Sequence, residues 1–94
     1  MSPNARVINS EVVHGPSGGV RALTRYLVDM CSSTVCVDVG SGTIGEIKRL
    51  GADPKRVVEL FVDQMVKEGQ NPSDLQIINL PEFHARRIAK SLRT

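Results

Sequence analysis

Basic side chains gather near the end of the chain, where they could bind a polyanion. Arg86, Arg87, Lys90 and Arg93 follow one another there, and Glu82 is the only acid among them. Arg86, Lys90 and Arg93 stand four and then three residues apart, a spacing that places them on one face of a helix. Cations on one helix face are typical of surfaces that bind phosphate groups, but also of helices that are only solvated. The sequence leaves both interpretations open.

Two glycine-rich turns could present backbone N–H groups to an anion. The candidate residues are His14, Ser17, Gly18 and Gly19 in the first turn, and Ser41, Gly42 and Thr43 in the second. If a helix follows each turn, the first N–H groups of that helix lack partners and favour a phosphate or carboxylate. The first turn is not a P-loop, because it has no lysine at the required spacing. An ordinary strand-to-helix turn that uses glycine for its geometry is the alternative.

The two histidines, His14 and His84, each come shortly after a segment that we predict to be a strand. In a parallel sheet they would approach each other beside the hydroxyls of the two turns. A histidine and a hydroxyl are the types of a general base and a nucleophile. Hydroxyls at helix starts more often cap the helix, however. We therefore name no catalytic residue, and we place His84 among the candidate anion-binding residues.

The two cysteines, Cys31 and Cys36, are separated by four residues. A single such pair with two distant histidines is a poor zinc site, so we expect no metal ion, and the sequence indicates no cofactor. The simplest interpretation is two buried, reduced thiols in a cytosolic protein, with a disulfide or redox switch as the alternative.

The segment from Val37 to Thr43, Val-Asp-Val-Gly-Ser-Gly-Thr, is similar to two known motifs. One is the first glycine-rich motif of Rossmann-like methyltransferases, and the other is the phosphate motif of the actin-like ATPases. Both resemblances imply a ligand site at the end of the strand, which for the second motif is a phosphate site. A strand that ends in a capped turn explains the same residues.

Residues 43–60 resemble the helix-turn-helix of DNA-binding proteins, with Leu50-Gly-Ala as the turn. The resemblance implies that the second helix carries Lys55, Arg56 and Glu59 into a groove of DNA. Ile47 lies one residue closer to the turn glycine than in the common pattern, and the second helix is apolar over a wide arc. A plain pair of helices inside a larger domain is the alternative.

The pattern of apolar residues predicts strands at Arg6–Val13, 34–39 and 74–80. Helical spacing predicts helices over residues 20–31, 43–50 and 54–67, and a last helix from Pro81. Ser17 and Asp53 are the expected N-caps of the first and third helices, and Thr43 with Glu46 forms a capping box for the second. Gly51 and Gly69 are expected to end the second and third helices.

These elements predict one domain, residues 1–94, of the α/β class. Because a helix separates each strand from the next, right-handed crossovers between parallel strands are expected. We therefore predict a small two- or three-layer sandwich in β-α-β-α-α-β-α order with a three-stranded, mostly parallel sheet. Leu27 and Phe61 are expected in the same core cluster. The exposed edges of such a sheet favour pairing with a second copy or a protein partner.

The composition limits the classes of function. A net charge of +2, with both signs interspersed, allows nucleic acid as a partner but does not demand it. Tyr26, Phe61 and Phe83 are the only aromatic residues besides histidine, which argues against a platform that stacks bases on rings in series. No segment approaches the ~20 apolar residues of a membrane span, so we expect a cytoplasmic protein with no membrane partner.

Three functions follow as hypotheses. The first is a non-enzymatic module that binds an anionic partner, nucleic acid before others, through the basic last helix and the helix starts at one sheet edge. The second is a protein-interaction or regulatory subunit, or an oligomerising adaptor, that uses the open sheet face. The third is a small phosphate-ligand binder or enzyme at the strand ends.

Overall fold

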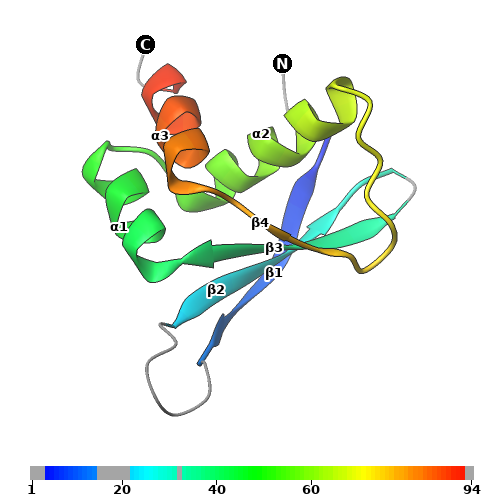
Figure 1. Cartoon of the computed structure of the whole chain (residues 1–94), viewed down its shortest axis with the longest axis horizontal. Helices are drawn as coiled ribbons and strands as arrows, with labels where there is room; N and C mark the ends of the chain where they lie inside the picture. Colours follow the sequence, from blue (N-terminus) through cyan, green and yellow to red (C-terminus); the bar gives the residue numbers. More distant parts are fainter. Residues whose placement is uncertain (1–3, 15–21, 32, 93–94) are drawn as a thin grey trace.

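The computed structural model of the chain describes residues 4–14, 22–31 and 33–92, which form a small mixed α/β domain (Figure 1). Its elements, in chain order, are β1 (Arg6–Val13), β2 (Leu23–Asp29), β3 (Thr34–Gly40), α1 (Ser41–Arg49), α2 (Pro54–Lys67), β4 (Ile77–Asn79) and α3 (Glu82–Ser91). The three helices lie together on one side of the strands. The domain therefore has two layers, one of sheet and one of helix.

The four strands form one sheet in the order β1-β2-β3-β4. β1 pairs antiparallel with β2, β2 pairs antiparallel with β3, and only β3 and β4 run parallel. The α/β class is confirmed, whereas the predicted three-stranded, mostly parallel sheet is wrong. The element order is also wrong, because the described chain follows β-β-β-α-α-β-α.

The source of both errors is the segment predicted as the first helix, which contains β2 instead. Its apolar residues fit helical spacing, but Thr24, Tyr26 and Val28 also alternate with half-buried neighbours, and these residue types favour strands. β1 and β3 pair with β2 from its first residue to its last. These pairings with two neighbouring strands override the local helical pattern. The expected cap Ser17 lies outside the described residues, and the helix that it was to cap is not present at Leu23–Asp29.

Two smaller predictions also fail. α1 begins at Ser41 with Gly40 as its N-cap, so Thr43 lies inside the first turn and forms no capping box. The last strand covers only Ile77–Asn79 of the predicted residues 74–80. Leu75 has a φ of 62°, in the left-handed region, which interrupts the extended backbone before β4.

The ends of α2 and the end of α1 are as predicted. The Asp53 carboxylate accepts the backbone N–H of Lys55 at 3.0 Å, and Pro54 occupies the first turn, where its missing N–H costs nothing. Gly51 and Gly69 have φ values of 85° and 87°, which glycine adopts at no steric cost. Each follows the last residues of its helix in a Schellman arrangement, as in the bond from the Ala52 N–H to the Ile47 carbonyl at 3.1 Å.

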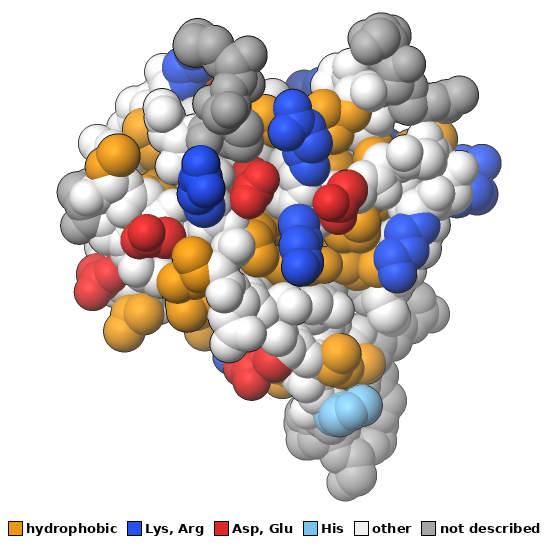
Figure 2. All heavy atoms as spheres, turned by 180° about the vertical axis from the view of Figure 1, so that it is seen from behind, with side chains coloured by type: hydrophobic (Ala, Val, Ile, Leu, Met, Phe, Trp, Pro, Cys, Tyr) orange, Lys and Arg blue, Asp and Glu red, His pale blue; other side chains and the backbone are white. Residues whose placement is uncertain are grey.

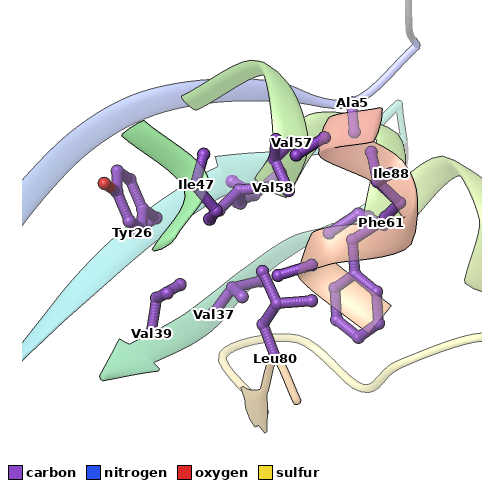
Figure 3. Packing of buried hydrophobic residues seen from close by; sticks show 14 of the residues in the cluster. Ala5, Tyr26, Val37, Val39, Ile47, Val57, Val58, Phe61, Leu80 and Ile88 are labelled. Atoms are coloured by element: carbon purple, nitrogen blue, oxygen red, sulfur yellow. The ribbon is translucent and has the colours of Figure 1, made fainter. Parts of the chain in front are cut away.

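The core lies between one face of the sheet and the helices. Figure 3 shows Val37 and Val39 of β3 on the sheet side, with Ile47 of α1 and Val58 of α2 above them. Phe61 of α2, 5% exposed, belongs to this cluster, as predicted. Leu27 is only half-buried, because alternation along β2 turns it to the opposite face while Tyr26 and Val28 enter the core. The prediction that Leu27 shares the core with Phe61 is therefore wrong.

Two carboxylates of α2 hold the start of β1 and the two residues before it. Glu59 accepts the N–H of Val7 at 2.9 Å, and Asp63 accepts the N–H groups of Asn4 at 3.0 Å and Ala5 at 2.9 Å. Val7 belongs to β1, an outer strand, where an open N–H group would otherwise invite pairing with another chain, and Asn4 and Ala5 directly precede that strand. α2 thus covers part of the β1 edge.

None of the helices in the described ranges is both long and apolar enough to cross a membrane.

Candidate functional site

The parallel pair of strands brings the starts of α1 and α3 to one end of the sheet. α1 follows β3 directly and α3 follows β4 after a short turn, so both helices begin at the carboxyl ends of neighbouring strands. A hollow of about 300 Å³ lies between the two starts. Its lining includes Asp38, Ser41, Gly42, Thr43, Asn79 and Glu82. This is the kind of place where α/β folds bind ligands.

Neither helix start at the hollow has a side-chain cap. Gly40 and Pro81 occupy the two N-cap positions, whereas α2, which starts elsewhere, is capped by Asp53. The first N–H groups of an α-helix have no partner within the helix and are available to water or an anion unless another segment accepts them. At the start of α1 the Ser41 N–H already donates to the Ala22 carbonyl at 3.3 Å, so the later N–H groups of that turn are the candidates for an anion. Thr43 also lines the hollow, and it is only 9% exposed.

Two carboxylates also face the hollow, and they differ in their surroundings. Asp38 is nearly buried and receives two hydrogen bonds from the Arg25 guanidinium, at 2.7 Å from Nε and 3.0 Å from Nη2. The hydrogen bond and the charge of Asp38 raise the pKa of Arg25 above its ordinary value. Glu82 is exposed at the first position of α3, and no Lys or Arg of the described residues forms an ion pair with it. The hollow alone is therefore not strongly positive.

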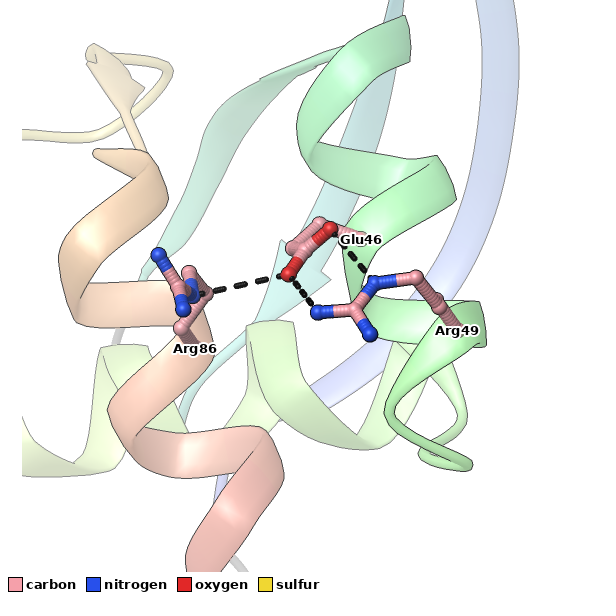
Figure 4. Close-up of polar contacts among 3 residues, drawn as sticks. All are labelled: Glu46, Arg49 and Arg86. Carbon is pink, nitrogen blue, oxygen red and sulfur yellow. Dashed lines mark hydrogen bonds and ion pairs between the residues drawn. The ribbon is translucent and has the colours of Figure 1, made fainter.

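The positive charge lies farther along the two helices, around a single carboxylate. Figure 4 shows Glu46 of α1 between Arg49 of the same helix and Arg86 of α3. Arg49 Nε lies 3.0 Å from Glu46 Oε2, and Arg86 Nε lies 3.5 Å from Glu46 Oε1. The hydrogen bond from Arg49, followed by the charges of Arg49, Arg86 and Lys90, lowers the pKa of Glu46 below its ordinary value. We call these four residues the α1–α3 seam.

The seam carries more cations than its one acid can neutralise. The Arg49 and Arg86 side chains are 64% and 44% exposed, whereas that of Glu46 is 21% exposed. Glu82, Arg86 and Lys90 are spaced by four residues on α3, so each lies about 6 Å farther from the hollow along the helix axis. A ligand with several phosphates could therefore contact the helix starts and the seam at once.

The predicted site residues fall into distinct places. Ser41, Gly42 and Thr43 line the hollow, and Arg86 and Lys90 lie in the seam. Arg87 is exposed on α3, and His14 is exposed just after β1. Ser17, Gly18, Gly19 and Arg93 lie outside the described residues.

The two histidines do not come together. β1 and β4 are the outer strands, with β2 and β3 between them, so the ends that lead to His14 and His84 are separated by about 14 Å of sheet. His84 instead faces α2, where its Nε2 lies 3.1 Å from Gln64 Oε1 and its ring meets Phe61 edge-on at 5.0 Å. The set of general base and hydroxyl that a parallel arrangement would have assembled is therefore not formed by His14 and His84.

The second helix of the helix-turn-helix resemblance is packed within the domain. Val57, Val58, Phe61 and Val62 of α2 are buried, and Glu59 is engaged by the Val7 N–H. Lys55 and Arg56 are exposed, but they lie at the start of a helix that packs against β1 and β2 of the sheet and against the other two helices. This geometry favours the plain pair of helices.

Three seam and surface residues were missed by sequence reasoning. Glu46 and Arg49 stand three residues apart, a spacing at which an ion pair on a helix could have been expected. The sequence contained no indication that Arg86 forms an ion pair with Glu46, because this contact depends on how α3 packs against α1. Phe83 is 67% exposed on the basic helix. Its position as an apolar residue among cations was the only indication in the sequence that it could belong to a binding surface.

The prediction for the cysteines needs a correction. Cys31 is exposed and Cys36 is half-buried, and neither forms a disulfide. Cys31 lies beyond the end of β2, in the connection to β3, because the predicted helix that would have buried it is a strand. The free-thiol state is as predicted, but the burial of both thiols is wrong.

Comparison of the chain with models of known protein families, with curated proteins and with solved structures found no match. Within residues 4–14, 22–31 and 33–92, no group of three or more His, Cys, Asp or Glu side chains is placed to hold a metal ion. The hollow and the seam are therefore the features of the molecule that point to a function.

Proposed function

We propose that this protein is a non-enzymatic module that binds nucleic acid along the α1–α3 seam and the adjoining hollow. The observation that carries the proposal is the position of Arg49, Arg86 and Lys90 around Glu46. Two helices that start at the same sheet end contribute these cations, so the uncapped helix starts and the basic groups belong to the same pair of helices.

The chemistry of the seam suits a phosphate backbone. A guanidinium has five N–H donors in a fixed fork, and the Glu46 carboxylate, which Arg49 and Arg86 share, cannot accept all of them. The remaining donors of two exposed arginines can bind phosphate oxygens through charged hydrogen bonds. Lys90 adds a flexible point charge farther along α3.

The charge is local rather than general. On the side of the molecule shown in Figure 2, Lys and Arg side chains are interspersed with Asp and Glu. The net charge of the whole chain is only +2. We therefore expect binding that weakens with salt and that depends on a few cations rather than on the overall charge.

The test is the binding of a labelled oligonucleotide, measured by fluorescence anisotropy over a series of salt concentrations. The double variant Arg86→Gln/Lys90→Gln should bind about tenfold more weakly or worse at low salt, and its slope of log affinity against log salt should be shallower by roughly 1.4 for a single strand. The control, Lys55→Gln/Lys67→Gln, removes the same charge from exposed positions on α2 and should bind nearly as the unmodified protein does.

Two results would contradict the proposal. One is an unmodified protein that binds no oligonucleotide at low salt. The other is an equal loss in both double variants, which would assign the binding to total charge and not to the seam.

A second candidate function is association with another protein through the uncovered face of the sheet. Leu27, Cys36 and Ile77 stand side by side across three strands on that face, and Ile77 is 52% exposed. Sedimentation velocity tests self-association directly: Ile77→Lys should shift a concentration-dependent oligomer of the unmodified protein to monomer. A monomer at all concentrations before substitution would leave self-association without support.

A further inference from the structure

An aromatic ring lies exposed within the basic face of α3. Phe83 is 67% exposed and stands in the first turn of the helix. Arg86 and Arg87 follow it by three and four residues, so both neighbour it on the helix surface. Lys90, seven residues on, lies on the same side two turns away. The core side of α3 is formed by Ala85, Ile88 and Ala89, which leaves this face to solvent.

The ring of Phe83 packs against a second ring, that of His84, which is itself held in place by α2. It stacks on the ring of His84, with centroids 6.1 Å apart and an angle of 27° between the planes. The His84 ring is held in turn by Gln64 at 3.1 Å and by the edge of buried Phe61 at 5.0 Å. Because the ring behind Phe83 is fixed to α2, the exposed ring loses little freedom when a second flat group stacks on its outer side.

We propose that Phe83 stacks on an unpaired base, so that the partner of this protein is single-stranded nucleic acid. This inference rests on the proposed function and specifies its ligand. Cations bind the phosphates of either a duplex or a single strand, but the faces of bases are open to an aromatic side chain only where they are unpaired. A ring flanked by two arginines can take one base while the arginines hold the adjacent backbone.

A single ring is consistent with the low aromatic content of the chain. Platforms that bind several bases use rings in series, and this chain has no such series. One stacking contact beside a basic seam predicts modest affinity with little dependence on base identity, since every base has a π-face.

The experiment compares a single-stranded oligothymidylate with a duplex of the same length, at one salt concentration, for three proteins. The unmodified protein should bind the single strand more tightly than the duplex. Phe83→Leu, which keeps an apolar side chain but removes the π-face, should weaken single-strand binding about tenfold and leave duplex binding unchanged. Phe83→Tyr keeps the ring and should bind as the unmodified protein does.

A second readout reports stacking itself. A fluorescent adenine analogue placed within the single strand should be quenched on binding to the unmodified protein and to Phe83→Tyr, and not on binding to Phe83→Leu. Because Phe83 is exposed, the thermal midpoints of all three proteins should agree, which excludes unfolding as the cause of a loss.

The outcomes separate this inference from the proposed function. If both probes bind with equal affinity, or if Phe83→Leu binds and quenches as the unmodified protein does, the stacking role is wrong while the binding of nucleic acid stands. If neither probe binds, the proposed function fails and the inference fails with it. A Phe83→Leu protein that binds both probes unchanged but loses a protein partner would assign the ring to a protein interface instead.

Discussion

Replacing Phe61 by alanine is expected to lower the free energy of unfolding by about 3–5 kcal/mol. Phe61 is 5% exposed and belongs to the cluster that joins α2 to the sheet and to α3. Truncation removes the transfer energy of the ring and leaves a cavity that a close-packed core fills only in part. Urea denaturation followed by circular dichroism measures the change, with the midpoint and slope fitted for each protein.

Val66→Ala is the matched control for this prediction. Val66 lies on the same helix but is 44% exposed, so its truncation should change the free energy of unfolding by no more than about 0.5 kcal/mol. A Phe61→Ala protein as stable as this control would show that Phe61 is not in the core. Phe61 also supports the ring of His84, so the same variant is expected to lower single-strand binding if enough of it stays folded.

The second large effect comes from placing a charge on the buried face of β2. Val28 is fully buried and its neighbour Leu27 is half-buried on the other face. Val28→Asp puts a carboxylate into the core, where the cost is several kcal/mol and comparable with the whole stability of a small domain. We expect this variant to lose its cooperative thermal transition.

Leu27→Asp serves as the control for Val28→Asp, because it introduces the same carboxylate one residue away on the uncovered face. Its thermal transition should survive at a lower midpoint. The pair therefore tests the alternation of β2 directly. If Leu27→Asp unfolded the domain and Val28→Asp did not, the face assignment of the strand would be reversed, and with it the side on which the helices pack.

The ion pair between Glu46 and Arg86 connects stability with the proposed site. It joins α1 to α3 across the seam, at the place where a phosphate would compete for the same guanidinium. Because both side chains are partly exposed, the pair adds little to the stability of the fold. In the proposed function, the pair holds Arg86 and Arg49 close together before a ligand arrives.

The candidate site was foreseen in part. The basic residues of α3 and the turn at Ser41–Thr43 could be named from the sequence, because charge and glycine content are visible in any chain. Their meeting in one surface depends on the parallel pairing of β3 with β4, which starts α1 and α3 side by side. The roles that we propose for Glu46, Arg49 and Phe83 follow only from that arrangement.

The sequence by itself determined the elements whose signals are local. β1 and β3 are apolar, β-branched segments that end at glycine or proline, and α2 has a capping Asp53, a proline in its first turn and a closing Gly69. Each signal acts through neighbours within a few residues, so it needs no knowledge of the rest of the fold.

Only the tertiary structure decided β2, the strand directions and the burial of Leu27 and Cys31. The segment that became β2 satisfies both a helical and an extended pattern, and the choice depends on hydrogen bonds to β1 and β3. Such bonds join separate strands, and their free energy exists only when all three strands are in place. For the same reason, the order of the strands and the face on which each side chain lies could not be read from the local spacing of apolar residues.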